Sequence, residues 1–349
     1  MSLPPPHGPL LEGFNLCKTF EVKRRMGSPR AWVHALDDVS LAINFGETLG
    51  LVGESGCGKS TVGRTLLRLI EPDSGSIWFD GEDITHAIPL RMRALRKRIQ
   101  IVFQDPYASL DPRLTVYGTL AEVLKVHRIC PAAEIPGRVA GLLERVGLPQ
   151  AAAHRYPHEF SGGQRQRIGI ARSLSVGPDL IVADEAVSAL DVSIQAQILD
   201  LLGRLKDEHG LSYLFISHDL GVVRYFCQTA AVMYLGRIVE TGPVGRVFDD
   251  PLHPYTRMLR QASPVPDPAI ARDTVQVTGE VPSPLDPPAG CHFHPRCPLA
   301  MPVCREIRPP LCDAGGGRKV ACHLHPGQPA VPVAPPDAGA KLGETAYEG

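Results

Sequence analysis

The chain has 349 residues, 44% of them hydrophobic, which is enough for one large α/β domain with a smaller addition. Its 36 Lys and Arg against 37 Asp and Glu give a formal charge of -1, which excludes an overall electrostatic footprint for nucleic acid or anionic lipid. No apolar run approaches the roughly 18 to 20 residues of a membrane helix, and residues 1–9 carry no secretory signal. A cytoplasmic location is the default expectation.

The first quarter of the chain alternates strand-like and helical runs. Strands are expected at 36–43, 48–52 and 76–79, with a helix over 61–70. This alternation is typical of a nucleotide-binding α/β core. The chain is therefore expected to begin such a core by about residue 11.

Helical patterns dominate from about residue 91 to residue 175, with candidates at 116–127, 136–146 and 164–175. This run indicates a helical subdomain inserted into the core. The alternation then resumes, and the expected elements are strand 180–183, helix 192–209, strand 213–217, helix 220–227 and strand 230–235.

The composition changes to Pro, Cys and His from about Pro251, and 282-PSPLDPP-288 breaks any helix. A small separate module is expected over 251–325. The last stretch, 326–349, is rich in Pro, Ala and Gly and is expected to be disordered.

A phosphate-binding loop follows the strand expected at 48–52. The run 53-GESGCGKS-60 fits G-x-x-x-x-G-K-[ST] and lies between a strand and a helix, as the motif requires. Lys59 is placed to reach the β- and γ-phosphates, and the Ser60 hydroxyl to bind Mg²⁺. Cys57 is interpreted as a small loop residue rather than a redox sensor. The nucleotide-binding residues expected here are Gly53, Ser55, Gly56, Cys57, Gly58, Lys59, Ser60 and Thr61.

Two carboxylates end the apolar run 180–183. Asp184 and Glu185 are therefore expected at the C-terminal edge of a buried parallel strand, where ligands collect. Asp184 would hold Mg²⁺, and Glu185 would orient and polarise the attacking water. The alternative is a carboxylate pair that caps the next helix.

Two further polar residues follow expected strands. His218 comes after 213–217, where its imidazole could contact the γ-phosphate or the water-positioning carboxylate. Gln104 follows the run 99–103, where its amide oxygen could reach Mg²⁺ or the water. Alone, each would be unremarkable, since a loop histidine is usually just solvated.

A second candidate phosphate site opens the helix expected at 164–175. Here 161-SGGQ-164 would direct backbone N–H groups at phosphate, a feature that most nucleotide-binding folds lack. Ser161, Gly162, Gly163 and Gln164 are therefore candidate nucleotide contacts.

In this order the motifs resemble the nucleotide-binding subunits of ABC transporters, over about residues 11–325. The resemblance implies an α/β P-loop ABC ATPase core at 11–250, with the helical subdomain inserted at about 91–175 and a small Cys-rich C-terminal module at 251–325. It assigns the family's roles as follows: Walker A at 53–60, the Q-loop glutamine Gln104, the signature at 161–164, Walker B ending at Asp184, the catalytic Glu185, the D-loop 188-SALD-191 with Asp191, and the switch histidine His218.

Three further positions are compared with the family pattern. Phe20 takes the place of the aromatic that stacks on adenine. Phe160 replaces the usual Leu before the signature, and Ala186 the usual Pro after the glutamate. Neither replacement removes a functional group, so the resemblance implies a competent active site.

Within the superfamily the chain is most similar to the ATP-binding subunits of bacterial oligopeptide and dipeptide importers. The runs that carry this are 104-QDPYASLDPR-113, 184-DEAVSALDVSIQAQILDLL-202, 253-HPYTRML-259 and 290-GCHFHPRCPLA-300. The resemblance implies ATP hydrolysis with Mg²⁺, separate membrane permeases, a second ATP-binding subunit of the same or a related chain, a solute-binding protein acting indirectly, and no nucleic acid. It also implies a place on the cytoplasmic face of the cell membrane. The alternatives are another solute such as nickel, or a soluble ABC ATPase without a transport role.

Five of the nine cysteines crowd between Cys291 and Cys322, which favours metal over disulfides in a reducing compartment. Cys291, Cys297, Cys304 and Cys322 are spaced C-x5-C-x6-C-x17-C, with Cys312 as a spare. Three interpretations compete: a [4Fe–4S] cluster on these four thiolates, a Zn²⁺ site that includes nearby histidines, and free cysteines in a small core. The spacing lacks the C-x2-C pairs of zinc ribbons. The resembled group can carry an iron–sulfur cluster in this tail, so the cluster is the favoured expectation.

Overall fold

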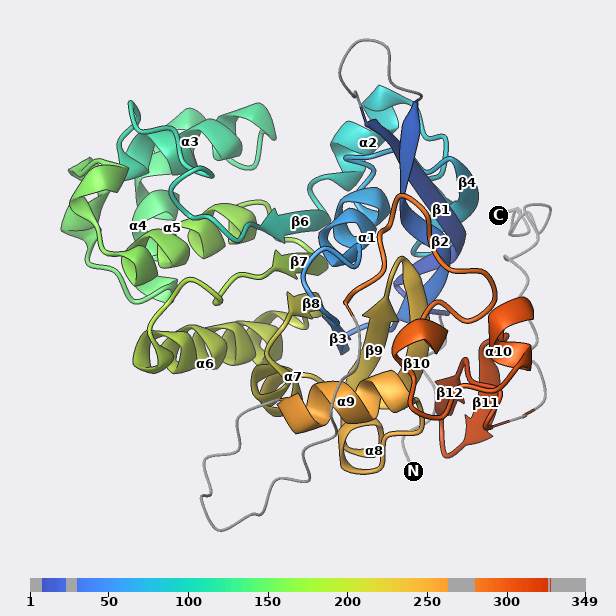
Figure 1. The fold of residues 1–349 in the computed structure, drawn as a ribbon. Coiled ribbons are helices and arrows are strands. Elements are labelled where there is room, and N and C mark those ends of the chain that lie inside the picture. Colours follow the sequence, from blue (N-terminus) through green and yellow to red (C-terminus); the bar gives the residue numbers. More distant parts are fainter. Residues whose placement is uncertain (1–7, 23–29, 263–279, 326, 328–349) are drawn as a thin grey trace, which may run out of the picture.

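The computed structural model describes residues 8–22, 30–262, 280–325 and 327, which form two sheets with helices packed around them (Figure 1). The smaller sheet is antiparallel, in the order β2-β1-β4-β5. Its strands are β1 (Leu11–Val22), β2 (Ala31–Ile43), β4 (Ser74–Phe79) and β5 (Glu82–Asp83).

The larger sheet has the order β11-β12-β10-β9-β3-β8-β7-β6, and its run from β9 to β6 is parallel. Every residue of β3, β7 and β8 is buried, as expected for a parallel sheet covered on both faces. The strands are β3 (Thr48–Val52), β6 (Ile99–Val102), β7 (Leu180–Asp184), β8 (Ser212–Ser217), β9 (Thr229–Tyr234), β10 (Arg237–Pro243), β11 (Cys312–Gly315) and β12 (Arg318–Val320).

The four neighbouring parallel strands β3, β8, β7 and β6 bring the candidate motifs to one edge of this sheet (Figure 1). The phosphate loop follows β3, His218 follows β8, and Gln104 follows β6 closely. Glu185 follows β7 directly. Because parallel strands end at the same edge, residues far apart in the sequence become neighbours here.

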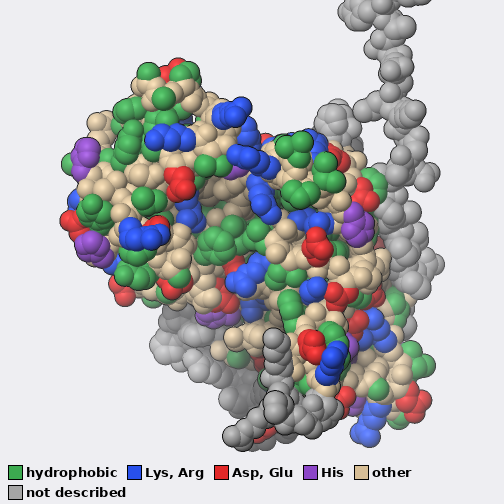
Figure 2. Space-filling view, turned by 90° about the horizontal axis from the view of Figure 1, so that it is seen from above, with side chains coloured by type: hydrophobic (Ala, Val, Ile, Leu, Met, Phe, Trp, Pro, Cys, Tyr) green, Lys and Arg blue, Asp and Glu red, His purple; other side chains and the backbone are tan. Residues whose placement is uncertain are grey.

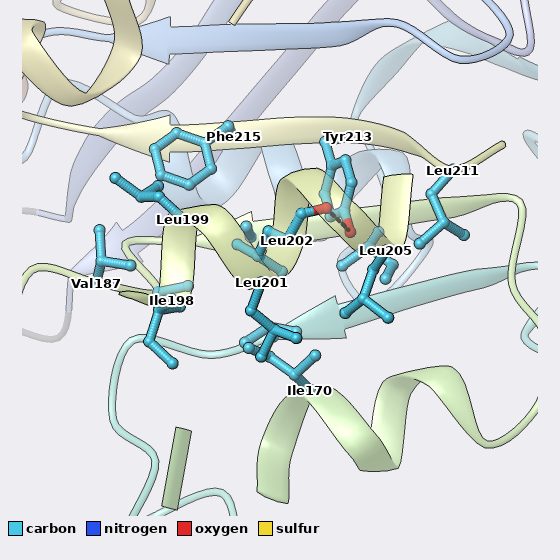
Figure 3. Packing of buried hydrophobic residues seen from close by; sticks show 14 of the residues in the cluster. Ile170, Val187, Ile198, Leu199, Leu201, Leu202, Leu205, Leu211, Tyr213 and Phe215 are labelled. Carbon is cyan, nitrogen blue, oxygen red and sulfur yellow. Dashed lines mark hydrogen bonds between the residues drawn. The ribbon is translucent and has the colours of Figure 1, made fainter. Parts of the chain in front are cut away.

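Helix α6 (Val192–His209) shows how the sequence covers this sheet. Its buried residues, Ile198, Leu199, Leu201, Leu202 and Leu205, recur at helical spacing and form one apolar stripe. Figure 3 shows this stripe packed against Tyr213 and Phe215 of β8. The Tyr213 hydroxyl donates to the Leu202 carbonyl at 3.3 Å, which satisfies the polar tip of a buried ring.

The helices α3 (Val116–Val126), α4 (Ile135–Arg145) and α5 (Gly162–Leu174) pack on one another at the left of Figure 1. They lie between β6 and β7 in the chain. Although β6 falls inside the helical range expected from the sequence, it pairs with β7 in the core sheet. In the view from above in Figure 2, Lys and Arg side chains gather along the middle of the face, where the helical part meets the core.

The remaining helices are α1 (Lys59–Leu66), α2 (Pro89–Leu95), α7 (Leu220–Phe226), α8 (Val244–Asp249), α9 (Pro254–Ala262) and α10 (Val303–Glu306). Short 3-10 turns occur at η1 (Ala132–Glu134), η2 (Gln150–His154), η3 (Pro157–Glu159) and η4 (His294–Arg296). Of the helices described, none has the combined length and apolar character that crossing a membrane would require.

The helix predicted over 61–70 was extended too far, because α1 ends at Leu66. Arg68 adopts a left-handed backbone with φ 52°. The N–H groups of Leu69 and Ile70 both donate to the Arg64 carbonyl, which closes the helix end. This terminator is an arginine rather than the usual glycine, so the sequence gives no signal for it.

The C-terminal region is not set apart from the core in the part of the chain that is described. Strand β12 pairs with β10, with Glu240 opposite Val320, and so extends the large sheet. Phe293 is 2% exposed and packs against Tyr234 and Tyr255, with ring centroids 5.2 and 5.4 Å away. The expectation of a separate module is therefore not confirmed. The tail expected to be disordered, 326–349, lies outside the described residues except for Gly327.

Candidate nucleotide-binding site

The phosphate loop is shaped by close contacts that only glycine permits at two positions. A Cβ on Gly53 would lie 2.2 Å from the Met233 carbonyl oxygen, and one on Gly58 would lie 2.3 Å from that of Ala35. Gly58 also has a φ of 108°, which other residues rarely adopt. The path of the loop is therefore fixed by the backbones of β9, which contains Met233, and β2, which contains Ala35.

Lys59 lies inside the curl of this loop. Its Nζ donates to the carbonyls of Gly53 at 2.8 Å and Glu54 at 2.9 Å, and the residue is 4% exposed. The loop thus holds the ammonium in place by backbone oxygens. Cys57 is also 4% exposed, and burial raises the pKa of its thiol despite the nearby ammonium. A raised pKa supports the interpretation of Cys57 as a small structural residue rather than a reactive thiol.

The Ser60 hydroxyl and the Asp184 carboxylate meet beside the loop. Ser60 Oγ donates to Asp184 Oδ1 at 2.7 Å, and Arg64 Nη2 lies 3.7 Å from Oδ2. Burial raises the pKa of Asp184, while Ser60 and Arg64 oppose that rise. A hydroxyl next to a buried carboxylate is a hard oxygen pair of the kind that Mg²⁺ prefers. These residues fit the expected magnesium site.

Glu185 is the meeting point of three strand ends. Gln104 Nε2 donates to Glu185 Oε2 at 2.9 Å, and His218 Nδ1 lies 3.5 Å from the same oxygen. The Glu185 backbone is left-handed, with φ 49°, and its N–H donates to the Ile216 carbonyl at 3.0 Å. Backbone strain held by the surrounding strands is common at functional sites. The carboxylate is therefore positioned by both its main chain and its two side-chain partners.

A cleft of ≈ 330 Å³ opens between the phosphate loop and these groups. Of the residues predicted from the sequence, those that line it are Phe20, Ser55, Gly56, Cys57, Gly58, Lys59, Ser60, Thr61, Gln104 and Glu185. Gly53, Asp184 and His218 lie just behind, in contact with Lys59, Ser60 and Glu185 respectively. The structure thus brings the phosphate loop and the strand-end residues together at one site.

Six further residues line the cleft and were not predicted from the sequence: Val33, His34, Ala35, Leu235, Gly236 and Pro284. The His34 N–H donates to the Pro284 carbonyl at 3.0 Å, so the C-terminal region reaches the cleft there. In the sequence, Pro284 belongs to a run that indicated only a broken helix. No local pattern signals a contact across that distance.

The signature residues lie elsewhere, at the start of α5. Ser161 Oγ accepts from the Gln164 N–H at 3.4 Å, while Gln164 Oε1 accepts from the Ser161 N–H at 3.1 Å. This reciprocal pair is a capping box. Ser161 and Gly162 are exposed, and none of the four signature residues is among those that line the described cleft. The helix start is therefore open toward solvent rather than toward the chain's own phosphate loop.

Gly163 and Asp191 show how α5 and α6 approach one another near the signature. A Cβ on Gly163 would lie 2.4 Å from Ile194 Cγ2, so glycine permits close packing of the two helices. Asp191 precedes α6 as its N-cap, is exposed, and makes no side-chain capping bond. Its carboxylate is thus available beside the signature.

Comparison with known proteins agrees with this geometry. The "ABC transporter" family model matches residues 36–188, and "Oligopeptide/dipeptide transporter, C-terminal region" matches residues 239–304. The chain is 53% identical to "Probable peptide ABC transporter ATP-binding protein y4tS" of Sinorhizobium fredii, over 87% of this chain and 86% of that protein. It is 51% identical to the oligopeptide transport ATP-binding protein AppF of Bacillus subtilis, over 84% of this chain and 90% of that protein. The chain belongs to the ATP-binding subunits of ABC transporters.

The resemblance drawn from the sequence motifs is thus confirmed for this ABC subunit. A solved structure of the dimeric ATP-binding cassette MJ0796, in a post-hydrolysis state with ADP and phosphate, is 29% identical. It has a TM-score of 0.59 and covers 67% of this chain and 98% of that chain. The P-loop ABC ATPase fold is therefore shown, with mixed α/β sheets. The C-terminal family match begins inside β10, which is a strand of the core sheet.

The structure does not confirm the expected iron–sulfur cluster. Within the described residues, no group of three or more His, Cys, Asp or Glu side chains is arranged to hold a metal ion. All nine cysteines are free thiols, and burial raises the pKa of Cys291 to about 11. The neighbouring thiols of Cys297, Cys304 and Cys322 contribute to that rise, so the four sulfurs gather in one part of the fold. The Cys291 N–H donates to the Cys304 carbonyl at 2.8 Å.

Proposed function

We propose that the subunit binds Mg²⁺ and ATP in the cleft that Phe20 and the phosphate loop line. Hydrolysis of this ATP would power peptide uptake through separate permease subunits. The observation that carries the catalytic part is the convergence of Gln104 and His218 on Glu185, beside the phosphate loop. The peptide part rests on the C-terminal family match and on the relatives named for peptide and oligopeptide transport. Oligopeptides or dipeptides are the proposed solutes.

In the binding step, Phe20 would stack on the adenine, since its ring is 37% exposed and lines the cleft. The backbone N–H groups of residues 55–61 would surround the phosphates, with the Lys59 ammonium at the β- and γ-phosphates. Ser60 and Asp184 would hold Mg²⁺, with Gln104 beside it. The ion's chemistry would be to offset the phosphate charge.

In the chemical step, Glu185 would accept a hydrogen bond from water and direct it in line at the γ-phosphorus. Gln104 and His218 both contact Oε2 of this carboxylate, so its orientation would be set before water arrives. His218 would also contact the γ-phosphate.

The signature at 161–164 would act on the nucleotide of a second ATP-binding subunit, either the same chain or a related one. Two observations support this arrangement: the helix start is exposed and capped, and residues 161–164 are not part of the described cleft lining. Asp191 would lie at the same interface. Two ATP molecules would close the dimer, and hydrolysis would reopen it.

The permeases would anchor the subunit to the cytoplasmic face of the cell membrane. Their coupling helices would contact the surface near residues 104–113, where Tyr107 is 50% exposed. A solute-binding protein would act on the ATPase indirectly, through the permeases.

Reconstitution with candidate permeases and a binding protein in liposomes tests the proposed function. We expect peptide to stimulate ATP hydrolysis and to accumulate inside the vesicles in proportion to the ATP consumed. The measurement is phosphate release and labelled peptide uptake in the same vesicles, with the Lys59→Ala subunit as the inactive control. Stimulation by nickel or another small solute, with none by peptide, would contradict the peptide assignment while leaving the ATPase role intact.

We also propose that Cys291, Cys297, Cys304 and Cys322 bind a [4Fe–4S] cluster. The donor set supports this, because all four are free thiols and Cys297, Cys304 and Cys322 lie near enough to Cys291 to raise its pKa. In such a cluster each thiolate binds a different iron, so the four sulfurs need not converge on one ion.

Anaerobic purification tests this cluster. The protein is expected to be brown and to contain about four iron and four sulfide per chain. Cys297→Ser should lose both, whereas Cys130→Ser, a matched change outside the cysteine group, should keep them. A colourless preparation with zinc would exclude the cluster, and a metal-free one would favour the free-cysteine interpretation.

A further inference from the structure

The C-terminal region contacts the phosphate loop at Glu54, a residue that is not part of the described cleft lining. Arg296, in η4, donates through Nη1 and Nη2 to both carboxylate oxygens of Glu54, at distances of 2.9 to 3.1 Å. Tyr255, in α9, accepts a hydrogen bond from the Glu54 N–H at 2.9 Å. Glu54 belongs to the phosphate loop, 242 residues before Arg296. Two distant segments therefore meet on one loop residue.

Arg296 is enclosed by apolar groups. It is 7% exposed, its guanidinium lies 5.9 Å from the Tyr234 ring centroid and 6.0 Å from that of Phe293, and its Nη2 lies 3.8 Å from Met258 Sδ. A buried charge needs a counter-ion, and the paired oxygens of Glu54 supply it. The bidentate geometry holds Glu54 in one orientation.

Glu54 is fixed at three of its groups. Its N–H donates to Tyr255, its carboxylate accepts from Arg296, and its carbonyl accepts from Lys59 Nζ at 2.9 Å. The same carbonyl accepts from the Cys57 N–H at 3.3 Å, which closes the turn. The position of Glu54 therefore sets the turn from which the following N–H groups extend.

The phosphate loop has two faces. The cleft is lined by Ser55 and the residues after it up to Thr61, whereas neither Gly53 nor Glu54 is part of the described lining. Glu54 thus faces the C-terminal region while its successors face the nucleotide. Tyr255 and Arg296 lie outside that lining too, so their effect on nucleotide is indirect, and Glu54 is the loop residue that both of them contact.

We propose that Arg296 and Tyr255 are positioning residues that hold the phosphate loop in its nucleotide-binding shape through Glu54. The region beyond β10 thereby determines how tightly the subunit binds nucleotide. This inference rests on the proposed nucleotide site. It adds the dependence of that site on two residues that never contact the ligand.

The test uses the full-length subunit, Mg²⁺ and a fluorescent ATP analogue. Arg296→Met should weaken nucleotide binding about tenfold, a change of about 1.4 kcal/mol. It should raise the KM for ATP by a similar factor and leave kcat at saturating ATP within about twofold, because the hydrolytic groups stay in place. Tyr255→Phe removes only the hydroxyl and should shift the same quantities in the same direction.

Arg308→Met is the matched control. Arg308 also ties the C-terminal region to the core, through Asp37 and Asp38 at 3.3 and 3.0 Å, but it does not touch the phosphate loop. We expect it to lower the melting temperature without weakening nucleotide binding. If Arg296→Met likewise lowers only the melting temperature, Arg296 serves merely to attach the region, and the proposal is overturned.

A double-mutant cycle tests the route through Glu54. If Arg296 acts through that carboxylate, Glu54→Gln combined with Arg296→Met should bind nucleotide about as well as the weaker single variant. Losses that multiply would overturn this route. Lys59→Ala separates the nucleotide site from the positioning role of Arg296. If Lys59→Ala binds nucleotide as well as the unchanged subunit, the proposed nucleotide site is refuted. If Lys59→Ala loses binding but Arg296→Met binds nucleotide normally, only the positioning role is refuted.

Discussion

Glu185→Gln is expected to abolish ATP turnover while nucleotide binding persists. The amide keeps the size of the side chain but cannot polarise water as a carboxylate does, and loss of a general base typically costs about 10²- to 10⁴-fold in rate. Because reopening of the proposed dimer follows hydrolysis, the variant should accumulate as an ATP-bound dimer. Steady-state phosphate release and size-exclusion chromatography with Mg²⁺ and ATP measure the two effects.

Glu144→Gln is the control for this substitution. Glu144 is an exposed residue of α4, far along the chain from the strand ends, so its change to Gln should leave turnover unaltered. The fold should tolerate Gln at position 185, since the left-handed backbone there, with φ 49°, is no harder for Gln than for Glu. Normal turnover in Glu185→Gln would reduce the carboxylate to a structural role.

The convergence of Gln104 and His218 on Glu185 could be predicted because it depends on a general property of parallel sheets. Gln104, Glu185 and His218 each follow an apolar run, and parallel strands end at a common edge. In the structure, Gln104 Nε2 and His218 Nδ1 lie 2.9 and 3.5 Å from the same oxygen of Glu185. To predict that these residues meet, it was enough to identify the strands, and the order of the strands in the sheet was not needed.

The contribution of the C-terminal region could not be predicted in the same way. Arg296 and Pro284 lie in turns without helical or strand periodicity, and their partners Glu54 and His34 are far away in the sequence. The short strand β12, which joins this region to the large sheet, has only three residues. Such contacts follow from tertiary packing, so composition gave no sign that this region would extend the large sheet.

Ser161→Asp is expected to eliminate hydrolysis without destabilising the subunit. Asp is as good an N-cap as Ser, and a negative charge at a helix N-terminus is favourable, so α5 should remain folded. At the proposed interface, however, the carboxylate would face the partner's γ-phosphate. Repulsion between like charges at about 4 Å is worth about 4 kcal/mol in a partly shielded site, enough for a loss of 100-fold or more in turnover. Melting temperature and phosphate release are the measurements.

Ser161→Asn is the neutral control, because it keeps the cap without the charge and should retain most activity.

A mixture of Ser161→Asp and Lys59→Ala subunits then tests whether the signature acts on the partner. Each variant alone should be inactive. In a mixed dimer, the intact phosphate loop of the Ser161→Asp subunit faces the intact signature of the Lys59→Ala subunit, so one complete site forms. Recovery of turnover on mixing would place the two halves of the site on different chains. If mixed dimers form but no activity returns, the signature does not complete the site of an identical partner.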